Sequence, residues 1–129
     1  MKNLLSIQDE LNSGSLTLPD LVEQYIETIE KKNGTVNALV SFSAGDARKQ
    51  AADIQKKIDN GTAGQLAGSV VAVKDLICEK DKKTTCSSNI LRNFESVYDA
   101  TVIKKLAAED ALFIGRANMD EFAMGSSNE

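Results

Sequence analysis

The segment at residues 68–75, GSVVAVKD, constrains the fold of this chain more than any other stretch. Five small or β-branched residues run without a charge from Ser69 to Val73, and Lys74 and Asp75 follow directly. Short apolar runs of this composition, bounded by polar residues, are typical of buried strands. The sequence therefore predicts a core strand that ends in a polar site.

Lys74 has two interpretations at the end of such a strand. Most lysines at strand ends are solvated and pair weakly with a neighbouring aspartate. The alternative is a lysine that is held in place and partly desolvated, with its pKa lowered until it can act as a general base. The pattern alone leaves both interpretations open.

The chain contains no histidine, which restricts its chemistry. A Ser-His-Asp or Cys-His arrangement, or a metal site with histidine ligands, cannot be assembled from these residues. The two cysteines, Cys78 and Cys86, are too few for a zinc site, and a disulfide would be unusual in a cytoplasmic chain. We expect no metal and two buried or half-buried thiols, so acid–base chemistry would fall to lysine or another titratable residue.

Charge and hydropathy exclude further classes of protein. The 129 residues carry 15 Lys and Arg against 19 Asp and Glu, so a basic surface for direct nucleic-acid binding is disfavoured. No apolar run approaches the roughly 18 residues of a membrane span, and acids occupy the amino terminus where a signal peptide is apolar. We expect a cytoplasmic protein without membrane contact.

Capping residues and apolar periodicity predict alternating helices and strands. Such alternation is typical of an α/β fold with a parallel or mixed sheet. With three expected strands and a loop at residues 124–129, we expect an amino-terminal piece of something longer. The expected helices span about residues 4–11, 17–34, 43–60 and 99–107, with a further short helix before 124, and the expected strands span 36–42, 69–73 and 111–115.

Four segments resemble the amidase signature family: GSVVAVKDLIC, TTCSS, YDATVIKKL and GRANMDEFAMGSSNE. The resemblance covers residues 17–129 in the same order. It implies the amino-terminal part of the amidase signature fold, a mixed sheet flanked by helices that this chain leaves incomplete. Residues 1–129 would then form part of one amidase domain, with 1–64 a helical leading region with one strand and 65–129 the start of the catalytic core.

The resemblance also implies a catalytic role for Lys74. Members of the family use a serine nucleophile, a second serine in a cis peptide, and a lysine in an AVKD segment, which matches Lys74. A neutral lysine can take the nucleophile's proton through the bridging serine, so no histidine is needed. Asp75 would orient the local backbone or Lys74, or be a turn residue only. Leu76 departs from the polar residue that the family often has there, which leaves Lys74 unaffected.

Both family serines belong to a Gly- and Ser-rich segment that follows the matched region. Gly125, Ser126 and Ser127 look similar, but two polar residues follow them where further glycines are required. Neither serine is therefore assigned as the nucleophile. Met124, Gly125 and Ser126 are expected to wall the substrate pocket, and the alternative is a polar loop that ends a helix.

The implied function is release of ammonia from glutamine through an acyl-enzyme, for conversion of Glu-tRNA(Gln) to Gln-tRNA(Gln) by a ligase of protein biosynthesis. Partner subunits of a heterotrimeric amidotransferase would hold ATP and Mg²⁺ and contact the tRNA, and this chain would bind no cofactor. Without the serines the 129 residues alone should be inactive. The alternatives are a stand-alone amidase acting on another small amide, and a non-catalytic fragment or binding module.

Overall fold

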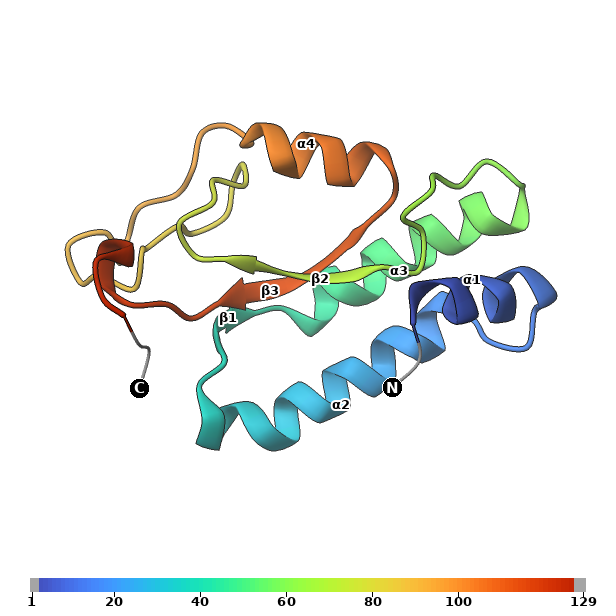
Figure 1. Ribbon diagram of the computed structural model, residues 1–129, viewed down its shortest axis with the longest axis horizontal. Helices are drawn as coiled ribbons and strands as arrows, with labels where there is room; N and C mark the ends of the chain where they lie inside the picture. The colour runs from blue at the N-terminus through green and yellow to red at the C-terminus, as the bar shows by residue number, and fades with distance from the viewer. Residues whose placement is uncertain (1–2, 127–129) are drawn as a thin grey trace.

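A three-stranded mixed sheet lies at the centre of the computed structural model, which describes residues 3–126 (Figure 1). The strands are β1 (Leu39–Phe42), β2 (Val70–Lys74) and β3 (Leu112–Ala117), in the order β1-β3-β2. β1 runs antiparallel to β3, and β2 runs parallel to it. The expected α/β class with a mixed sheet is confirmed.

Helices cover both faces of this sheet. α1 (Leu4–Ser13), α2 (Leu18–Val36) and α3 (Ala44–Asp59) lie on one side, and α4 (Thr101–Ala108) lies on the other (Figure 1). The larger core fills the space between the three-helix layer and β3. No helix within residues 3–126 is long and apolar enough to cross a membrane. The fully buried residues of the larger core are Leu18, Val22, Ile26, Ala47, Ala51 and Leu112.

Local capping chemistry sets the helix starts as the sequence predicts. The Thr17 hydroxyl accepts the Asp20 N–H at 3.2 Å, and the Ser43 hydroxyl accepts the Asp46 N–H at 3.2 Å. Gly14 ends α1 with a φ of 72°, a left-handed conformation that glycine adopts at little cost. These contacts lie within a few residues of sequence, which is why the pattern predicts them.

The predicted ends of two elements are wrong. α2 passes through Gly34, and Asn37 makes the left-handed stop with a φ of 51°. The cause is Asn33, whose side-chain amide pairs with the backbone N–H and C=O of Leu39 at 2.8 and 2.9 Å, so β1 begins only there. Asp99 does not cap α4, because its carboxylate accepts the backbone N–H of Lys80 at 2.7 Å.

The predicted burial of residues 69–73 is only partly correct. β3 occupies the centre of the sheet, so β2 is an edge strand among the described residues. Val73 is 3% exposed, whereas Ala72 and Lys74 are exposed. An apolar strand pattern suits a strand covered on both faces, and residues 3–126 cover β2 only in part.

Candidate active site

The carboxyl ends of β2 and β3 lie side by side at the left-hand end of Figure 1. The loops that follow the two strands gather at the same end, and the 3₁₀ helix η1 (Glu121–Ala123) lies among them. In α/β sheets, functional residues concentrate where parallel strands end, because the loops there converge. This end is therefore the candidate site.

Lys74 is the last residue of β2 and pairs in register with Ala117 of β3. Its side chain is exposed, and within residues 3–126 its ammonium group has no hydrogen-bond or ion-pair partner. The backbone alone therefore sets its direction in this part of the chain. The desolvation that a general-base lysine requires does not come from these residues.

Asp75 is 1% exposed and anchors the loop at residues 84–88. Its Oδ2 accepts the backbone N–H groups of Thr85 at 3.2 Å and Ser87 at 3.3 Å, and also the Thr85 hydroxyl. Its backbone carbonyl accepts the N–H of Cys86 at 3.0 Å. Asp75 thus orients local backbone and is more than a turn residue. Residues 84–89 are an anchoring loop.

Arg116, which the sequence pattern does not single out, is the buried cation of the site, with 4% of its surface exposed. Its Nε lies 3.4 Å from Asp75 Oδ1, and its Nη2 donates to the Ile77 carbonyl at 2.6 Å and to the Thr84 hydroxyl at 3.3 Å. Its Nη1 lies 3.5 Å from Glu79 Oε2. The available signal is alternation, since burial along β3 alternates and Arg116 falls at an inward position.

The two thiols lie beside this network. Cys78 and Cys86 are free and half-buried, as expected. Burial raises the pKa of the Cys86 thiol, and the Asp75 carboxylate raises the pKa further. Because the thiolate is the nucleophilic form, Cys86 is a poor nucleophile at neutral pH. Burial also raises the pKa of Glu79, although Arg116 opposes this effect.

The loop at residues 84–88 is bonded to the segment after β3. The Ser87 hydroxyl donates to Asn118 Oδ1 at 3.0 Å, the Ser88 hydroxyl donates to Glu121 Oε1 at 2.6 Å, and the Phe122 N–H donates to the Cys86 carbonyl at 3.1 Å. Both segments contain non-glycine residues in the left-handed region, at φ values of 50–56°. Such strained backbone persists where its surroundings hold it in place, and it clusters at functional sites. The strained residues are Cys86, Ser87, Phe122 and Ala123.

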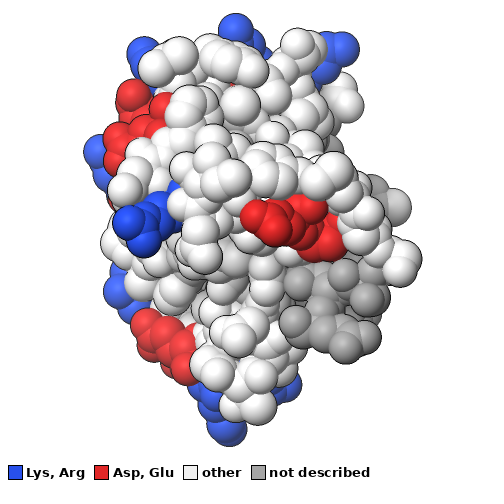
Figure 2. All heavy atoms as spheres, turned by 90° about the vertical axis from the view of Figure 1, so that its left-hand side faces the viewer, with Lys and Arg blue, Asp and Glu red and all other residues white. Residues whose placement is uncertain are grey.

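Met124, Gly125 and Ser126 lie beyond η1 on the surface, and Met124 is 80% exposed. The Gly125 N–H donates to Asp120 Oδ2 at 2.5 Å. Figure 2 views this end of the molecule directly and shows a largely uncharged surface, with most of the charged side chains toward its edges. These three residues line no cavity formed within residues 3–126, and Ser127 lies outside the described residues.

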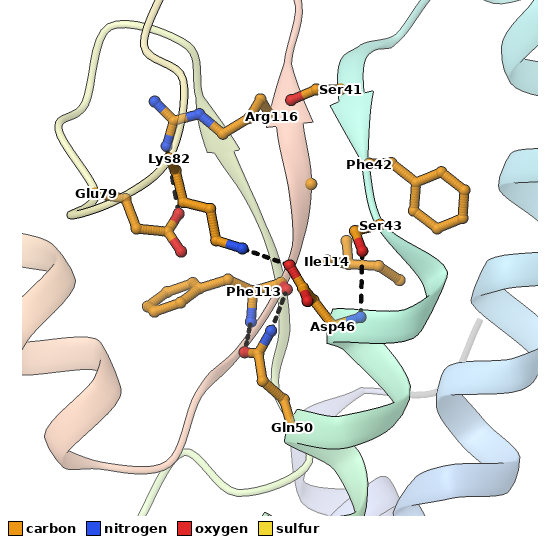
Figure 3. Close-up of a pocket in the computed structure, with 11 residues that line it drawn as sticks. Ser41, Phe42, Ser43, Asp46, Gln50, Glu79, Lys82, Phe113, Ile114 and Arg116 are labelled. Atoms are coloured by element: carbon orange, nitrogen blue, oxygen red, sulfur yellow. Dashed lines mark hydrogen bonds and ion pairs between the residues drawn. The ribbon is translucent and has the colours of Figure 1, made fainter. Parts of the chain in front are cut away.

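A cavity of about 140 Å³ lies behind Arg116, between β1, the start of α3, β3 and the turn at residues 79–82 (Figure 3). Its charged groups neutralise one another: Lys82 pairs with Asp46, and Arg116 with Glu79. The turn at 79–83 is therefore less solvated than its charge run predicts. Lys74 is not among the lining residues, and no cluster of metal-ligating side chains exists within the described part of the chain.

Comparisons with known proteins identify relatives for this chain. The family model described as Amidase matches residues 20–129. In Clostridium acetobutylicum, the second of the A-type subunits of glutamyl-tRNA(Gln) amidotransferase is 51% identical over 111 residues, which is 85% of this chain and 23% of the relative. The A-type subunit of the same enzyme from Chlorobium chlorochromatii is 42% identical over 130 residues, 100% of this chain and 27% of that protein. The chain thus spans about a quarter of the length of the curated relatives it matches.

Solved structures share the fold. A structure from work on the origins of an s-triazine catabolic enzyme, with inhibitor bound, has a TM-score of 0.89 and 31% identity over 96% of this chain and 28% of its own. Peptide amidase from Stenotrophomonas maltophilia has a TM-score of 0.86 and 25% identity over 94% of this chain and 25% of its own. A bacterial aryl acylamidase of the amidase signature family has a TM-score of 0.85 at 25% identity, over 94% of this chain and 26% of its own.

Proposed function

This chain belongs to the amidase family, and from that premise we propose that the protein containing it hydrolyses the side-chain amide of glutamine to supply ammonia for conversion of Glu-tRNA(Gln) to Gln-tRNA(Gln). The observation that carries the proposal is Lys74, which ends β2 beside the anchored Asp75 and the strained loops. Relatives named as A-type subunits of glutamyl-tRNA(Gln) amidotransferase support the choice of glutamine over other amides.

In the proposed mechanism, neutral Lys74 accepts a proton, through a bridging serine, from a nucleophilic serine. The serine oxygen bonds to the amide carbon, the C–N bond breaks, and the proton returns to the nitrogen, which leaves as ammonia. Water then hydrolyses the acyl-enzyme. We assign both serines, and the surface that desolvates Lys74, to parts of the amidase domain beyond residues 3–126.

The other parts of the proposal follow from the same premise. Residues 1–64 form a helical leading region with one strand, and residues 65–129 form the start of the catalytic core. Met124, Gly125 and Ser126 wall the substrate pocket, which their place beyond β3 at the same end as Lys74 supports. Partner subunits in the cytoplasm hold ATP and Mg²⁺ and make most tRNA contacts, in keeping with the net charge of −4 here.

Partner dependence tests the proposed function. Glutamine hydrolysis by the intact protein should be measured with and without its partner subunits, together with amidation of Glu-tRNA(Gln) in the presence of ATP. We expect hydrolysis of glutamine that the partners stimulate, and transfer of the released ammonia to the tRNA-bound glutamate. If glutamine is not hydrolysed under either condition, the proposed function is wrong.

A stand-alone amidase is the second candidate. It is supported by the structural likeness to peptide amidase and aryl acylamidase, whose names mention no partner protein. An enzyme of this kind should hydrolyse a small amide other than glutamine at the same rate with or without partners. The same assay, repeated with a panel of simple amides, separates the two candidates.

A further inference from the structure

We infer that Arg116 is a positioning residue for Lys74: it fixes the direction in which the chain leaves β2, and it links that turn to the loop at residues 84–88. The inference rests on the proposed function, because it assigns Arg116 a role in the activity of Lys74. Arg116 pairs in register with Val73, one residue before Lys74, so its side chain starts from the neighbouring strand.

The turn that follows Lys74 is held from the adjacent strand. The Ile77 N–H donates to the Lys74 carbonyl at 2.9 Å, which closes a tight turn directly after β2. The carbonyl of Ile77 in turn accepts Arg116 Nη2 at 2.6 Å. A charge-assisted hydrogen bond, a strong class of contact, therefore fixes the backbone that carries Lys74.

The same guanidinium group connects this turn to the neighbouring loop. Arg116 Nε faces one oxygen of Asp75 at 3.4 Å, and the other oxygen accepts N–H groups from Thr85 and Ser87. Arg116 Nη2 also reaches the Thr84 hydroxyl at 3.3 Å. One side chain thus bridges β3, the turn after β2, and the loop at residues 84–88. A lysine has no planar fork that could reach all three.

Burial makes these contacts hard to replace. The side chains of Arg116 and Asp75 are 5% and 1% exposed, so solvent cannot replace the contacts that a substitution removes. Loss of the guanidinium would leave the Asp75 carboxylate without its cation and the Ile77 carbonyl without a donor. Since the Lys74 ammonium has no partner within residues 3–126, a shift of its backbone would carry the ammonium with it.

Steady-state kinetics of the intact protein with its partner subunits test this role. The variants are Arg116→Gln, Arg116→Lys and Thr84→Val, which removes one acceptor with little change of shape. Arg48→Gln is the matched control, because that arginine pairs with Glu23 on the surface, away from the strand ends. The measurements are kcat and KM for glutamine from pH 6 to 10 and the thermal midpoint of each variant.

We expect Arg116→Gln to lower kcat by about 10²-fold, because small displacements of a reacting group are costly. We expect KM to stay within about threefold, since the contact acts on the reacting group and not on substrate binding. Arg116→Lys should recover part of kcat, and Thr84→Val should give a smaller loss. Arg48→Gln should match the unmodified protein.

A purely structural role predicts a different result. Asp110→Asn, a substitution of a buried carboxylate that lies away from this site, supplies the comparison at a similar loss of thermal midpoint. If Arg116→Gln loses no more kcat than Asp110→Asn, or if Arg116→Lys and Thr84→Val keep full kcat when Arg116→Gln does not fold, the inference is wrong. Lys74→Ala is assayed in parallel: if it stays active, the proposed function fails, whereas an inactive Lys74→Ala beside a fully active Arg116→Gln overturns this inference alone.

Discussion

At the scale of single residues, Asp110 joins the end of α3, the loop after it and the turn before β3. The residue is 6% exposed, and its carboxylate accepts the Lys57 ammonium at 2.5 Å and the Gly64 N–H at 2.9 Å. Burial raises the pKa of Asp110, but the hydrogen bonds from Lys57 and Gly64 together outweigh it, so the pKa lies below its usual value. The ionised form is therefore favoured by folding.

The lowered pKa of Asp110 predicts a pH-dependent contribution to stability. Such a contribution is fully present above the unfolded-state pKa, about 3.9, and is lost as the pH falls through the folded-state pKa. Asp110→Asn should lower the free energy of unfolding by about 1–3 kcal/mol at pH 7, and by less at pH 3. Urea unfolding at both pH values checks this, and an equal loss at both would contradict the assignment.

Single residues also mark where sequence reasoning succeeds. Lys74 and Asp75 stand out because they follow directly on an apolar run, and that signal is local. Arg116 does not stand out, because its partners Ile77 and Thr84 lie more than 30 residues away along the chain. Only the paired strands bring them together, so no short window of sequence contains the network.

At the scale of elements, Gln50 of α3 ends the β1–β3 ladder. The ladder stops where Phe42 pairs with Gly115, and beyond it the Gln50 side-chain amide pairs with Phe113. The Gln50 Nε2 donates to the Phe113 carbonyl, and the Phe113 N–H donates to Gln50 Oε1, both at 3.1 Å (Figure 3). The side chain thus takes the place of a further strand residue and joins α3 to the sheet.

Replacing Gln50 by leucine tests this connection. The change preserves the size of the side chain but leaves the partly buried N–H and C=O of Phe113 without their partner. We expect a loss of about 1–3 kcal/mol in the free energy of unfolding. Gln24→Leu, at an exposed site on α2, is the matched control and should change stability little. Equal unfolding midpoints for both variants would show that the amide is dispensable.

Helix positions could be predicted from the sequence, whereas strand order could not. Thr17 and Ser43 cap helices through contacts with residues three places ahead, which a local pattern captures. The end of α2 depends on Asn33 reaching Leu39, a side-chain choice that propensity does not reveal. The edge position of β2 depends on pairing between strands about 40 residues apart.

At the scale of the whole molecule, the site end exposes large apolar side chains and β2 has one unpaired edge within residues 3–126. Exposed edges and apolar patches promote association. We expect the isolated 129-residue chain to self-associate with rising concentration, as measured by sedimentation velocity, and a monomer at every concentration would contradict this. The exposed apolar residues after β2 and β3 include Leu76, Ile90, Phe94, Val97, Tyr98, Phe122 and Met124.

The central claim is that Lys74 is the general base of an amidase. The most direct measurement is glutamine hydrolysis by the intact protein carrying Lys74→Ala, beside Lys80→Ala as an exposed lysine from the nearby turn. We predict a loss on the order of 10²–10⁴-fold in kcat for Lys74→Ala, with thermal stability unchanged, and full activity for Lys80→Ala. A Lys74→Ala protein that hydrolyses glutamine at the unmodified rate would contradict the claim.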